Sequence, residues 1–195
     1  MTYGFMDVAV TPGVRAAQAE LGVDHMWRDF RGDRKFDRFR EDELAFIAER
    51  DTFYIATVSE TGWPYVQHRG GPRGFLKAVD DRTLVFGDFR GNFQFLSLGN
   101  LSTNDRASLI LMDYPRRRRL KILAHAEVID AANDKELTEL VTPLDGPRPE
   151  RVFKLKLVAF DWNCPKYIVP RYTEDEIAHA IGPLRERIAQ LSSLI

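Results

Sequence analysis

TFYIATVSETGWPYVQHRGG, residues 52–71, opens the stretch that decides the fold of this chain, which runs on to Glu127. Its segments rich in β-branched and aromatic residues are bounded by turn residues, which predicts strands. A later segment, VFKLKLVAFD, alternates apolar and polar residues, which also predicts a strand. Because the strands are closely spaced and joined by short turns, we expect an antiparallel meander that closes into a barrel to hide its edges. The expected strands are Phe53–Val58, Pro64–Arg69, Thr83–Phe89, Ala107–Tyr114, Leu120–Ile129 and Val152–Asp161.

Helices are expected on both sides of the strands. Thr11 and Pro12 are typical of a helix start, and Gly22 of its end. Thr173 and Glu176 have the spacing of a capping box, which predicts a final helix over residues 173–191. Further helices are expected over 41–50, 133–141 with Asn133 as cap, and within 90–106. We therefore expect a helix and irregular arm over residues 1–40, a barrel domain over 41–170, and a C-terminal helix over 171–195 packed on that domain.

Composition excludes several classes of protein. The chain has 195 residues, 44% of them hydrophobic and 29% charged, with a formal net charge of −1. That balance gives no overall field for nucleic acid or an anionic membrane surface, and no apolar run approaches the roughly 18 residues of a membrane span. The single cysteine, Cys164, excludes an internal disulfide and favours a reducing compartment. With no signal-peptide pattern at the N-terminus, a cytoplasmic location is expected.

Four consecutive arginines, Arg116–Arg119, precede the fifth expected strand. They could form a solvated turn, an RNA-binding segment or a cradle for an anion. The near-neutral net charge argues against nucleic acid, which requires a larger basic surface. The following strand would fix Arg118 and Arg119 in position, and the planar guanidinium binds phosphate in a bidentate way.

The segment Gln67–Gly71 offers polar groups on a strand. Alternation places Tyr65, Gln67 and Arg69 on one face and His68 on the other, where a histidine most often has a structural role. The two glycines permit either close approach of a ligand or a bulge. After the next strand, Phe89–Asn92 reads FRGN; a glycine before a helix start can direct backbone N–H groups at an anion, although most such segments are simple turns.

Other reactive residue types give weaker signals. Trp162 could stack on a planar ring or close the core. Cys164 could be a nucleophile, but no neighbouring sequence supplies a group that would stabilise a thiolate, so a buried inert thiol is favoured. The four histidines have neither paired spacing nor cysteine partners, so no metal site is expected.

The segments quoted above, together with LGNL, MDYPRRRRLKI and DWNCPK, resemble the FMN-binding split-barrel family of pyridoxamine 5′-phosphate oxidase and its relatives. The resemblance covers about residues 40–170. It implies an antiparallel six-stranded split β-barrel with flanking helices (α+β), a homodimer, and two FMN sites at the dimer interface built from both subunits.

The resemblance also implies positions for cofactor-binding residues. Val66, Gln67, His68 and Arg69 match the family strand that lines the flavin, and Phe86 and Gly87 match positions beside FMN. Asn92 stands where the oxidases carry a phosphate-binding arginine. Arg119 aligns with a glutamine that contacts the flavin, and Trp162 falls in the region of a C-terminal tryptophan. The missing arginine would be compensated by Arg69, Arg118, Arg119, Gln94, Ser97 and Asn100.

The C-terminal segment departs from the family. The oxidases end in an arginine- and tryptophan-bearing segment that recognises their substrate, whereas this chain ends in EDEIAHAIGPLRERIAQLSSLI. The resemblance therefore implies an FMN-dependent oxidoreductase acting on an unidentified small molecule, rather than a true pyridoxamine phosphate oxidase. A deazaflavin-dependent reductase and a non-catalytic flavin-binding or sensing dimer are the alternatives.

Overall fold

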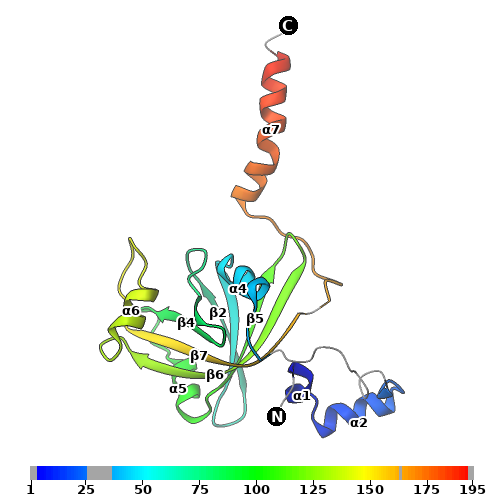
Figure 1. Ribbon diagram of the computed structural model, residues 1–195, viewed down its shortest axis with the longest axis vertical. Coiled ribbons are helices and arrows are strands. Elements are labelled where there is room, and N and C mark those ends of the chain that lie inside the picture. Colours follow the sequence, from blue (N-terminus) through cyan, green and yellow to red (C-terminus); the bar gives the residue numbers. More distant parts are fainter. Residues whose placement is uncertain (1–3, 26–36, 163, 193–195) are drawn as a thin grey trace.

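Seven antiparallel strands form one sheet in the order β2-β1-β5-β6-β7-β4-β3 (Figure 1). The computed structural model describes residues 4–25, 37–162 and 164–192. Each strand pairs with its neighbours in antiparallel register. The strands are β1 Thr52–Val58, β2 Pro64–Gly70, β3 Lys77–Asp80, β4 Thr83–Asp88, β5 Arg106–Asp113, β6 Arg118–Asp130 and β7 Arg151–Trp162.

The mainly antiparallel fold with flanking helices is confirmed, but the expected six strands are seven. The additional strand, β3, has only four residues, and three of them are exposed, so it carries no apolar alternation by which to recognise it. The order also departs from a simple meander, because β4 pairs with β7 rather than with β5. Hydrogen bonding leaves β2 and β3 as the two edges, so the sheet is open in its pairing.

Six helices are described: α1 Phe5–Ala9, α2 Pro12–Glu20, α4 Glu41–Ala48, α5 Leu96–Thr103, α6 Lys135–Val141 and α7 Glu174–Ser192. The expected cap of α2 is confirmed, since the Thr11 hydroxyl accepts a hydrogen bond from the Val14 N–H at 3.4 Å. The cap of α6 is Asp134, not Asn133, and its carboxylate accepts from the Leu137 N–H at 3.0 Å. The central part of the expected irregular arm, residues 26–36, lies outside the described residues.

The core lies on the inner face of the curled sheet. Phe53 on β1 and Phe86 on β4 have ring centroids 5.2 Å apart, although their strands are far apart in the hydrogen-bonded order. Phe86 stacks in turn on Phe153 of β7 at 4.9 Å. All three rings are buried, and each contributes about 1.5–3 kcal/mol through burial. The sheet therefore curls until strands near its two ends share one aromatic cluster.

Helix α4 covers one end of this core. Phe46 meets the ring of Trp162 edge-on at 4.8 Å. The Trp162 indole N–H donates to the buried Glu43 carboxylate at 2.6 Å, and the second oxygen of Glu43 accepts from the Arg40 N–H at 3.0 Å. Of the two roles open to Trp162, closing the core is the one that the structure shows.

Helix α7 extends away from the sheet (Figure 1). Its capping box is confirmed: the Glu176 carboxylate accepts from the Thr173 N–H at 2.8 Å, and the Thr173 hydroxyl accepts from the Glu176 N–H at 3.2 Å. The expected packing on the barrel domain is not observed, since no residue of α7 is buried. Among the described residues, no helix combines the length and apolarity needed to cross a bilayer.

Candidate functional site

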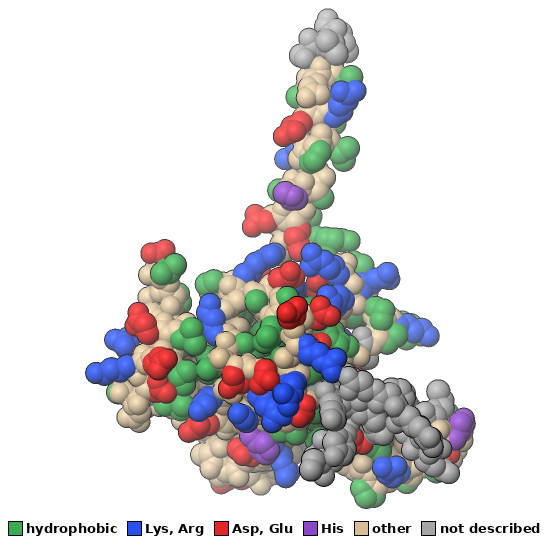
Figure 2. All heavy atoms as spheres, in the orientation of Figure 1, with side chains coloured by type: hydrophobic (Ala, Val, Ile, Leu, Met, Phe, Trp, Pro, Cys, Tyr) green, Lys and Arg blue, Asp and Glu red, His purple; other side chains and the backbone are tan. Residues whose placement is uncertain are grey.

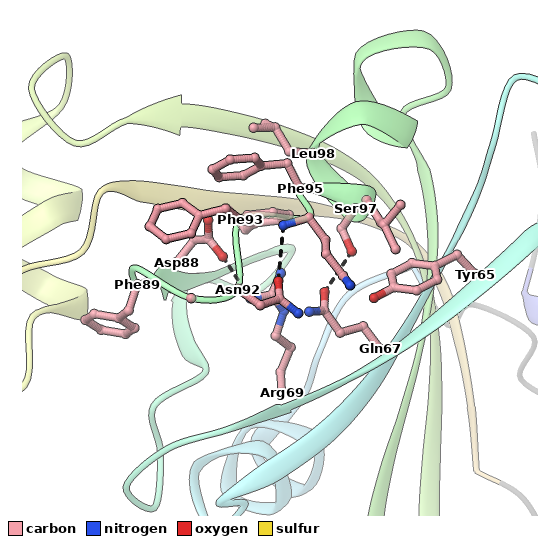
Figure 3. A pocket seen from close by; sticks show the side chains of 14 residues that line it. Tyr65, Gln67, Arg69, Asp88, Phe89, Asn92, Phe93, Phe95, Ser97 and Leu98 are labelled. Atoms are coloured by element: carbon pink, nitrogen blue, oxygen red, sulfur yellow. Dashed lines mark hydrogen bonds and ion pairs between the residues drawn. The ribbon is translucent and has the colours of Figure 1, made fainter.

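A cavity of about 250 Å³ opens between β2, the end of β4 and the segment that leads into α5 (Figure 3). Its wall is partly aromatic and partly polar, and it includes one arginine. The lining residues are Tyr65, Gln67 and Arg69 from β2, Asp88 from β4, Phe89, Gly91, Asn92, Phe93, Gln94 and Phe95 from the connection, Leu96, Ser97 and Leu98 from α5, and Phe153 from β7.

Arg69 is the cation of this cavity. Its Nη1 donates to the Asp88 carboxylate at 2.8 Å, and its guanidinium lies over the rings of Phe86 and Phe153 at 5.5 and 5.2 Å. The other oxygen of Asp88 accepts from Arg151 at 3.3 Å. The Nε of Arg69 is buried and has no hydrogen-bond partner. Such an orphaned donor costs about 1–3 kcal/mol, a cost that a ligand accepting a hydrogen bond would remove.

The segment before α5 contains two aromatic residues in an unusual backbone conformation. Phe93 and Phe95 have φ values of 61° and 51°, the left-handed region that bulky side chains rarely adopt. Both rings are exposed, and their centroids are 6.1 Å apart. Arg90 lies over Phe93 and Arg151 over Phe95, at 5.2 and 5.1 Å. Strained backbone that presents exposed aromatic rings to a cavity is typical of a ligand-binding segment.

The start of α5 adds backbone donors. Its N-cap residue is Phe95, which cannot cap with its side chain, and no side chain supplies a capping hydrogen bond. The first N–H groups of a helix have no partner within the helix and attract anions. Leu96, Ser97 and Leu98, the first residues of the helix, line the cavity, and α5 begins five positions after Gly91 of the FRGN segment.

Two further hydrogen bonds fix α5 against the sheet. The buried Ser97 hydroxyl donates to the Gln67 side-chain oxygen at 2.9 Å, which orients the Gln67 amide at the cavity wall (Figure 3). The Asn100 amide donates to the buried Thr57 hydroxyl at 2.9 Å. Asn100 therefore holds α5 in place and does not line the cavity, whereas the side chain of Asn92, at the wall, accepts from the Gln94 N–H at 3.2 Å.

The remaining residues expected on β2 and β4 lie elsewhere. Val66 and His68 are exposed on the opposite face of β2, where His68 bonds to Thr52 and meets the Tyr54 ring edge-on. Phe86 is buried beneath Arg69. Gly87 lies against Phe89 and Pro149 rather than in the cavity wall. Gly71 has a packing role, since a Cβ there would stand 2.8 Å from the Phe75 ring.

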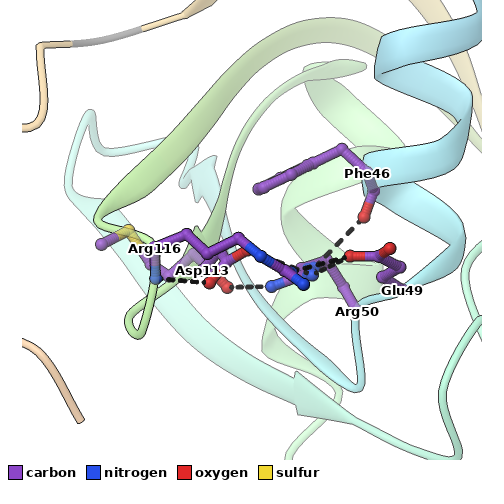
Figure 4. Close-up of polar contacts among 6 residues, drawn as sticks. Phe46, Glu49, Arg50, Asp113 and Arg116 are labelled. Carbon is purple, nitrogen blue, oxygen red and sulfur yellow. Dashed lines mark hydrogen bonds and ion pairs between the residues drawn. The ribbon is translucent and has the colours of Figure 1, made fainter.

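The arginine run divides between several roles. Arg116 donates to Asp113 at 3.1 Å and to Glu49 at 3.3 Å (Figure 4). The hydrogen bond to Asp113, together with the charges of Asp113 and Glu49, raises the pKa of Arg116 above its ordinary value. Arg50 completes this cluster, since it donates to the backbone carbonyls of Phe46 and Met112 at 3.2 Å each. Arg116 thus has a structural role, and Arg117 forms the turn with a φ of 52°.

Arg118 and Arg119 point to opposite faces of β6. Arg118 stacks on the rings of Trp162 and Phe46 at 4.5 and 5.3 Å, on the α4 side. Arg119 lies on the outer face opposite Met112 of β5, and its Nε is buried without a hydrogen-bond partner. Neither residue lines the cavity around Arg69, and nor does Trp162. Within one chain, the structure brings together Gln67, Arg69, Asn92, Gln94 and Ser97 of the expected set, and places the remainder outside that cavity.

The outer face of β2, β1, β5 and β6 is partly apolar, and among the described elements α1 reaches it where the Phe5 ring lies 4.5 Å from Lys121 Nζ. Val66 and Tyr54 are 62% and 36% exposed, and Ile110, Met112 and Leu123 are half-buried. The strand register aligns His68, Tyr54, Ile110 and Lys121 in one row across the four strands. Arg119 belongs to this face. A broad apolar surface with a cation in it is typical of an interaction surface.

Cys164 and the histidines give no second site. Cys164 is exposed, which corrects the expectation of a buried thiol. It follows the end of β7, where the chain leaves the sheet in an irregular segment. Among residues 4–25, 37–162 and 164–192, no three histidine, cysteine, aspartate or glutamate side chains gather as a metal site would require.

Several residues of the cavity were not among those expected from the sequence. Asp88 has the wrong charge for an anion site, and its pairing with Arg69 depends on the curl of the sheet. Phe153 comes from a strand 84 positions beyond Arg69 in the sequence, and only the register with β4 brings it there. Phe93 and Phe95 had one available signal, namely alternating aromatics in a segment without strand character.

The amino-acid sequence matches a known protein family. The profile of the family described as pyridoxamine 5′-phosphate oxidase matches residues 39–160, which is more than half of the chain. No curated protein matches the sequence. Many solved structures share the fold, and the two described next are 19% and 13% identical to this chain, which shows the fold alone.

HupZ of Group A Streptococcus superimposes with a TM-score of 0.53 at 13% identity, over 69% of this chain and 100% of that chain. A provisionally assigned pyridoxamine 5′-phosphate oxidase of Lactobacillus delbrueckii superimposes with a TM-score of 0.51 at 19% identity, over 64% of this chain and 94% of that chain. On the match of residues 39–160, this chain belongs to the pyridoxamine 5′-phosphate oxidase family.

Proposed function

We propose that this protein is a homodimeric FMN-binding flavoprotein that acts as an oxidoreductase on a small molecule in the cytoplasm. Family membership supports a flavin, and the cavity around Arg69 supports a phosphate-bearing one. The C-terminal helix, which does not resemble the substrate-binding segment of the oxidases, argues against pyridoxamine phosphate as the substrate. The outer-face location of Arg119 is most simply explained if it serves a site shared with a second copy.

A single observation carries the proposal. Among the described residues, two buried side-chain polar atoms lack a hydrogen-bond partner, and both are guanidinium nitrogens: Nε of Arg69 and Nε of Arg119. Buried polar groups in proteins are nearly always paired, so each exception calls for an explanation. The family resemblance implies, independently of burial, that both arginines lie beside the cofactor. An anionic, hydrogen-bonding ligand explains both atoms if it binds Arg69 of one copy and Arg119 of a second copy.

The size of the cavity supports a site completed by a second copy. Pockets for drug-sized ligands commonly have volumes of roughly 300–1,000 Å³, and this cavity has about 250 Å³. One chain therefore supplies part of a flavin site. The partly apolar outer face, which contains Val66, Tyr54 and Arg119, has the character of a surface that another chain covers.

Each group of residues then has a defined role. Arg69 and the first N–H groups of α5 would hold the phosphate, since both are donors at the cavity wall. Tyr65, Phe93 and Phe95 would supply the apolar walls for the ring system, and the Gln67 amide a hydrogen bond to its edge. When bound, the flavin supplies the electron transfer, so the chain needs to bind, orient and exclude water rather than provide a catalytic dyad.

Titration with FMN tests the proposal. Binding should quench flavin fluorescence with the wild type, and Arg69→Ala should weaken it about 10- to 100-fold because charge-assisted hydrogen bonds contribute about 1.5–3 kcal/mol. Arg15→Ala, which removes an exposed arginine on α2, is the matched control and should bind as the wild type does. Equal affinity of wild type and Arg69→Ala would contradict the assigned site.

Experiments on the same protein samples distinguish the proposed function from two alternatives. A deazaflavin cofactor would compete with FMN in the titration and displace it. A non-catalytic flavin-binding or sensing dimer would hold FMN tightly without oxidising reduced nicotinamides. Oligonucleotide binding that is lost on removal of Arg116–Arg119 would instead support a nucleic-acid partner, against which the net charge of −1 argues.

A further inference from the structure

Helix α7 carries an exposed apolar stripe along its whole length. Its large side chains recur at Ile177, Ile181, Leu184, Ile188 and Leu191. Ile177, Leu184, Ile188 and Leu191 are 48%, 63%, 64% and 49% exposed, and no residue of the helix is buried. Figure 2 shows hydrophobic side chains on this helix where it stands clear of the rest of the protein.

The spacing within the stripe is that of a coiled coil. The intervals are four, three, four and three residues, which is the alternation of heptad positions d and a. Ile181 and Ile188 fall at a, and Ile177, Leu184 and Leu191 at d. At the last two d positions the residue is leucine, and isoleucine at a with leucine at d is the combination that favours parallel two-stranded coiled coils. The stripe is complementary to a copy of itself rather than to a flat apolar surface.

The helix has little stability of its own. It contains Gly182 and Pro183 in its interior, and a proline there costs about 3 kcal/mol relative to alanine. Most of the stability of helices in proteins comes from packing of an apolar face, and no residue of α7 is buried. Pro183 falls at heptad position c, on the side away from the stripe, so its ring does not obstruct a partner that packs on the a and d positions. A packing partner would offset the cost.

The charges beside the stripe permit pairing with an identical helix in parallel. In that arrangement each g position faces the e position of the following heptad on the partner. The facing pairs are Ala180 with Arg185 and Arg187 with Ser192, so no two like charges oppose each other. Glu186, at f, points to solvent on the far side.

We propose that α7 pairs with α7 of a second copy as a short, parallel, two-stranded coiled coil. The pairing rests on the homodimer of the proposed function but not on the flavin. The segment just before the helix contacts the body, since Arg171 lies over the Tyr114 ring at 5.0 Å, and the first turn of the helix lines a cavity together with Arg50 and Asp113. The paired α7 helices of the two copies, called the clasp below, would therefore help to hold the dimer together.

Disulfide trapping in the full-length protein tests the pairing and its direction. In a Cys164→Ser background, Leu191→Cys places a thiol at d near the end of the helix, and Ala189→Cys places one at b, outside the stripe. In parallel pairing identical d positions face each other, whereas antiparallel pairing across the stripe would move Leu191 about 21 Å away, opposite Ile177. Under air oxidation, Leu191→Cys should run as a linked dimer on a non-reducing gel and Ala189→Cys as a monomer. Equal linkage of the two variants, or none, overturns the proposal.

Sedimentation of charge variants gives a second test without cysteines. Ile188→Lys puts a charge into the stripe and should raise the dimer dissociation constant about tenfold or more. Gln190→Lys makes the same charge change at position c and should leave the constant unchanged. An equal effect of both variants, or none, overturns the pairing. Flavin titration of the same samples separates the proposals: FMN binding with no Leu191→Cys linkage refutes the clasp alone, and linkage without FMN binding refutes the flavin assignment alone.

Discussion

Arg69 and Asp88 form an ion pair of 2.8 Å between strands near opposite ends of the sheet. β2 is one edge, and β4 is next to the other edge, so no backbone hydrogen bond joins them. Their side chains are 18% and 14% exposed, and the pair lies on the aromatic cluster of Phe86 and Phe153. A polar contact thus holds together the two ends of an open sheet, at the wall of the proposed site.

Removal of Asp88 should destabilise the fold. Asp88→Ala leaves Arg69 and Arg151 as largely buried cations without their shared carboxylate. We expect the free energy of unfolding to fall by about 1–3 kcal/mol, measured by urea denaturation. Asp145→Ala, in an exposed loop, is the control and should lie within about 0.5 kcal/mol of the wild type. If the two variants are equally stable, the pair does not hold the sheet ends together.

Substitution of Arg118 and of Arg119, at the start of β6, should have different effects on FMN affinity. Arg119→Ala removes an orphaned buried donor and should weaken FMN binding about tenfold, because a charge-assisted hydrogen bond contributes about 1.5–3 kcal/mol. Arg118→Ala removes a stacking partner of Trp162 and Phe46 and should lower stability by about 0.5–2 kcal/mol with FMN affinity unchanged. The reverse pattern would place the cofactor on the α4 side of the sheet.

Trp162 should matter for stability rather than for cofactor binding. Trp162→Phe keeps an aromatic ring beside Phe46 but removes the N–H that donates to the buried Glu43. Leaving that carboxylate with one partner fewer should cost about 1–3 kcal/mol in the free energy of unfolding. FMN affinity should match that of the wild type, and a large loss of affinity would show that Trp162 contacts the cofactor.

Asp80 should give a pH-dependent contribution to stability. Burial opposes ionisation of its carboxyl group, but hydrogen bonds from the Arg82 N–H at 2.7 Å and the Thr83 hydroxyl at 3.0 Å outweigh that effect and lower the pKa of Asp80. A lowered pKa in the folded state stabilises the protein above the unfolded value of about 3.9. The stability advantage of wild type over Asp80→Asn should be present at pH 7 and lost as the pH falls below about 4. An advantage that persists at pH 2 would contradict this assignment.

The fold was predictable where local pattern decides it. The strands β1, β5, β6 and β7 show apolar alternation, β4 is a short apolar run bounded by turn residues, and the Thr11 and Thr173 caps are recognisable from their side chains. β3 has no such pattern, because its exposed side chains contribute nothing to the core. The order of the strands was not predictable, since the pairing of β4 with β7 is decided by which apolar faces meet after the sheet curls.

The site was predictable on β2 and the α5 connection, where alternation alone sorts Gln67 and Arg69 from Val66 and His68. On β6 alternation separates Arg118 from Arg119 but does not tell which of them lies nearer the cavity, because that depends on how the sheet curls. Arg118 and Arg119 are adjacent, but a strand sends adjacent side chains to opposite faces. One therefore stacks on Trp162 while the other lies on the outer face beside Met112.

The Asp88 carboxylate also sets a condition on what may enter the cavity. An anion that enters the cavity must share Arg69 with the Asp88 carboxylate, which already accepts a hydrogen bond from it. A single, diffuse negative charge gains little by competing with it. A doubly charged phosphate is better matched to the remaining guanidinium hydrogens and the open start of α5, so riboflavin, which lacks the phosphate, should be rejected in favour of its phosphorylated form.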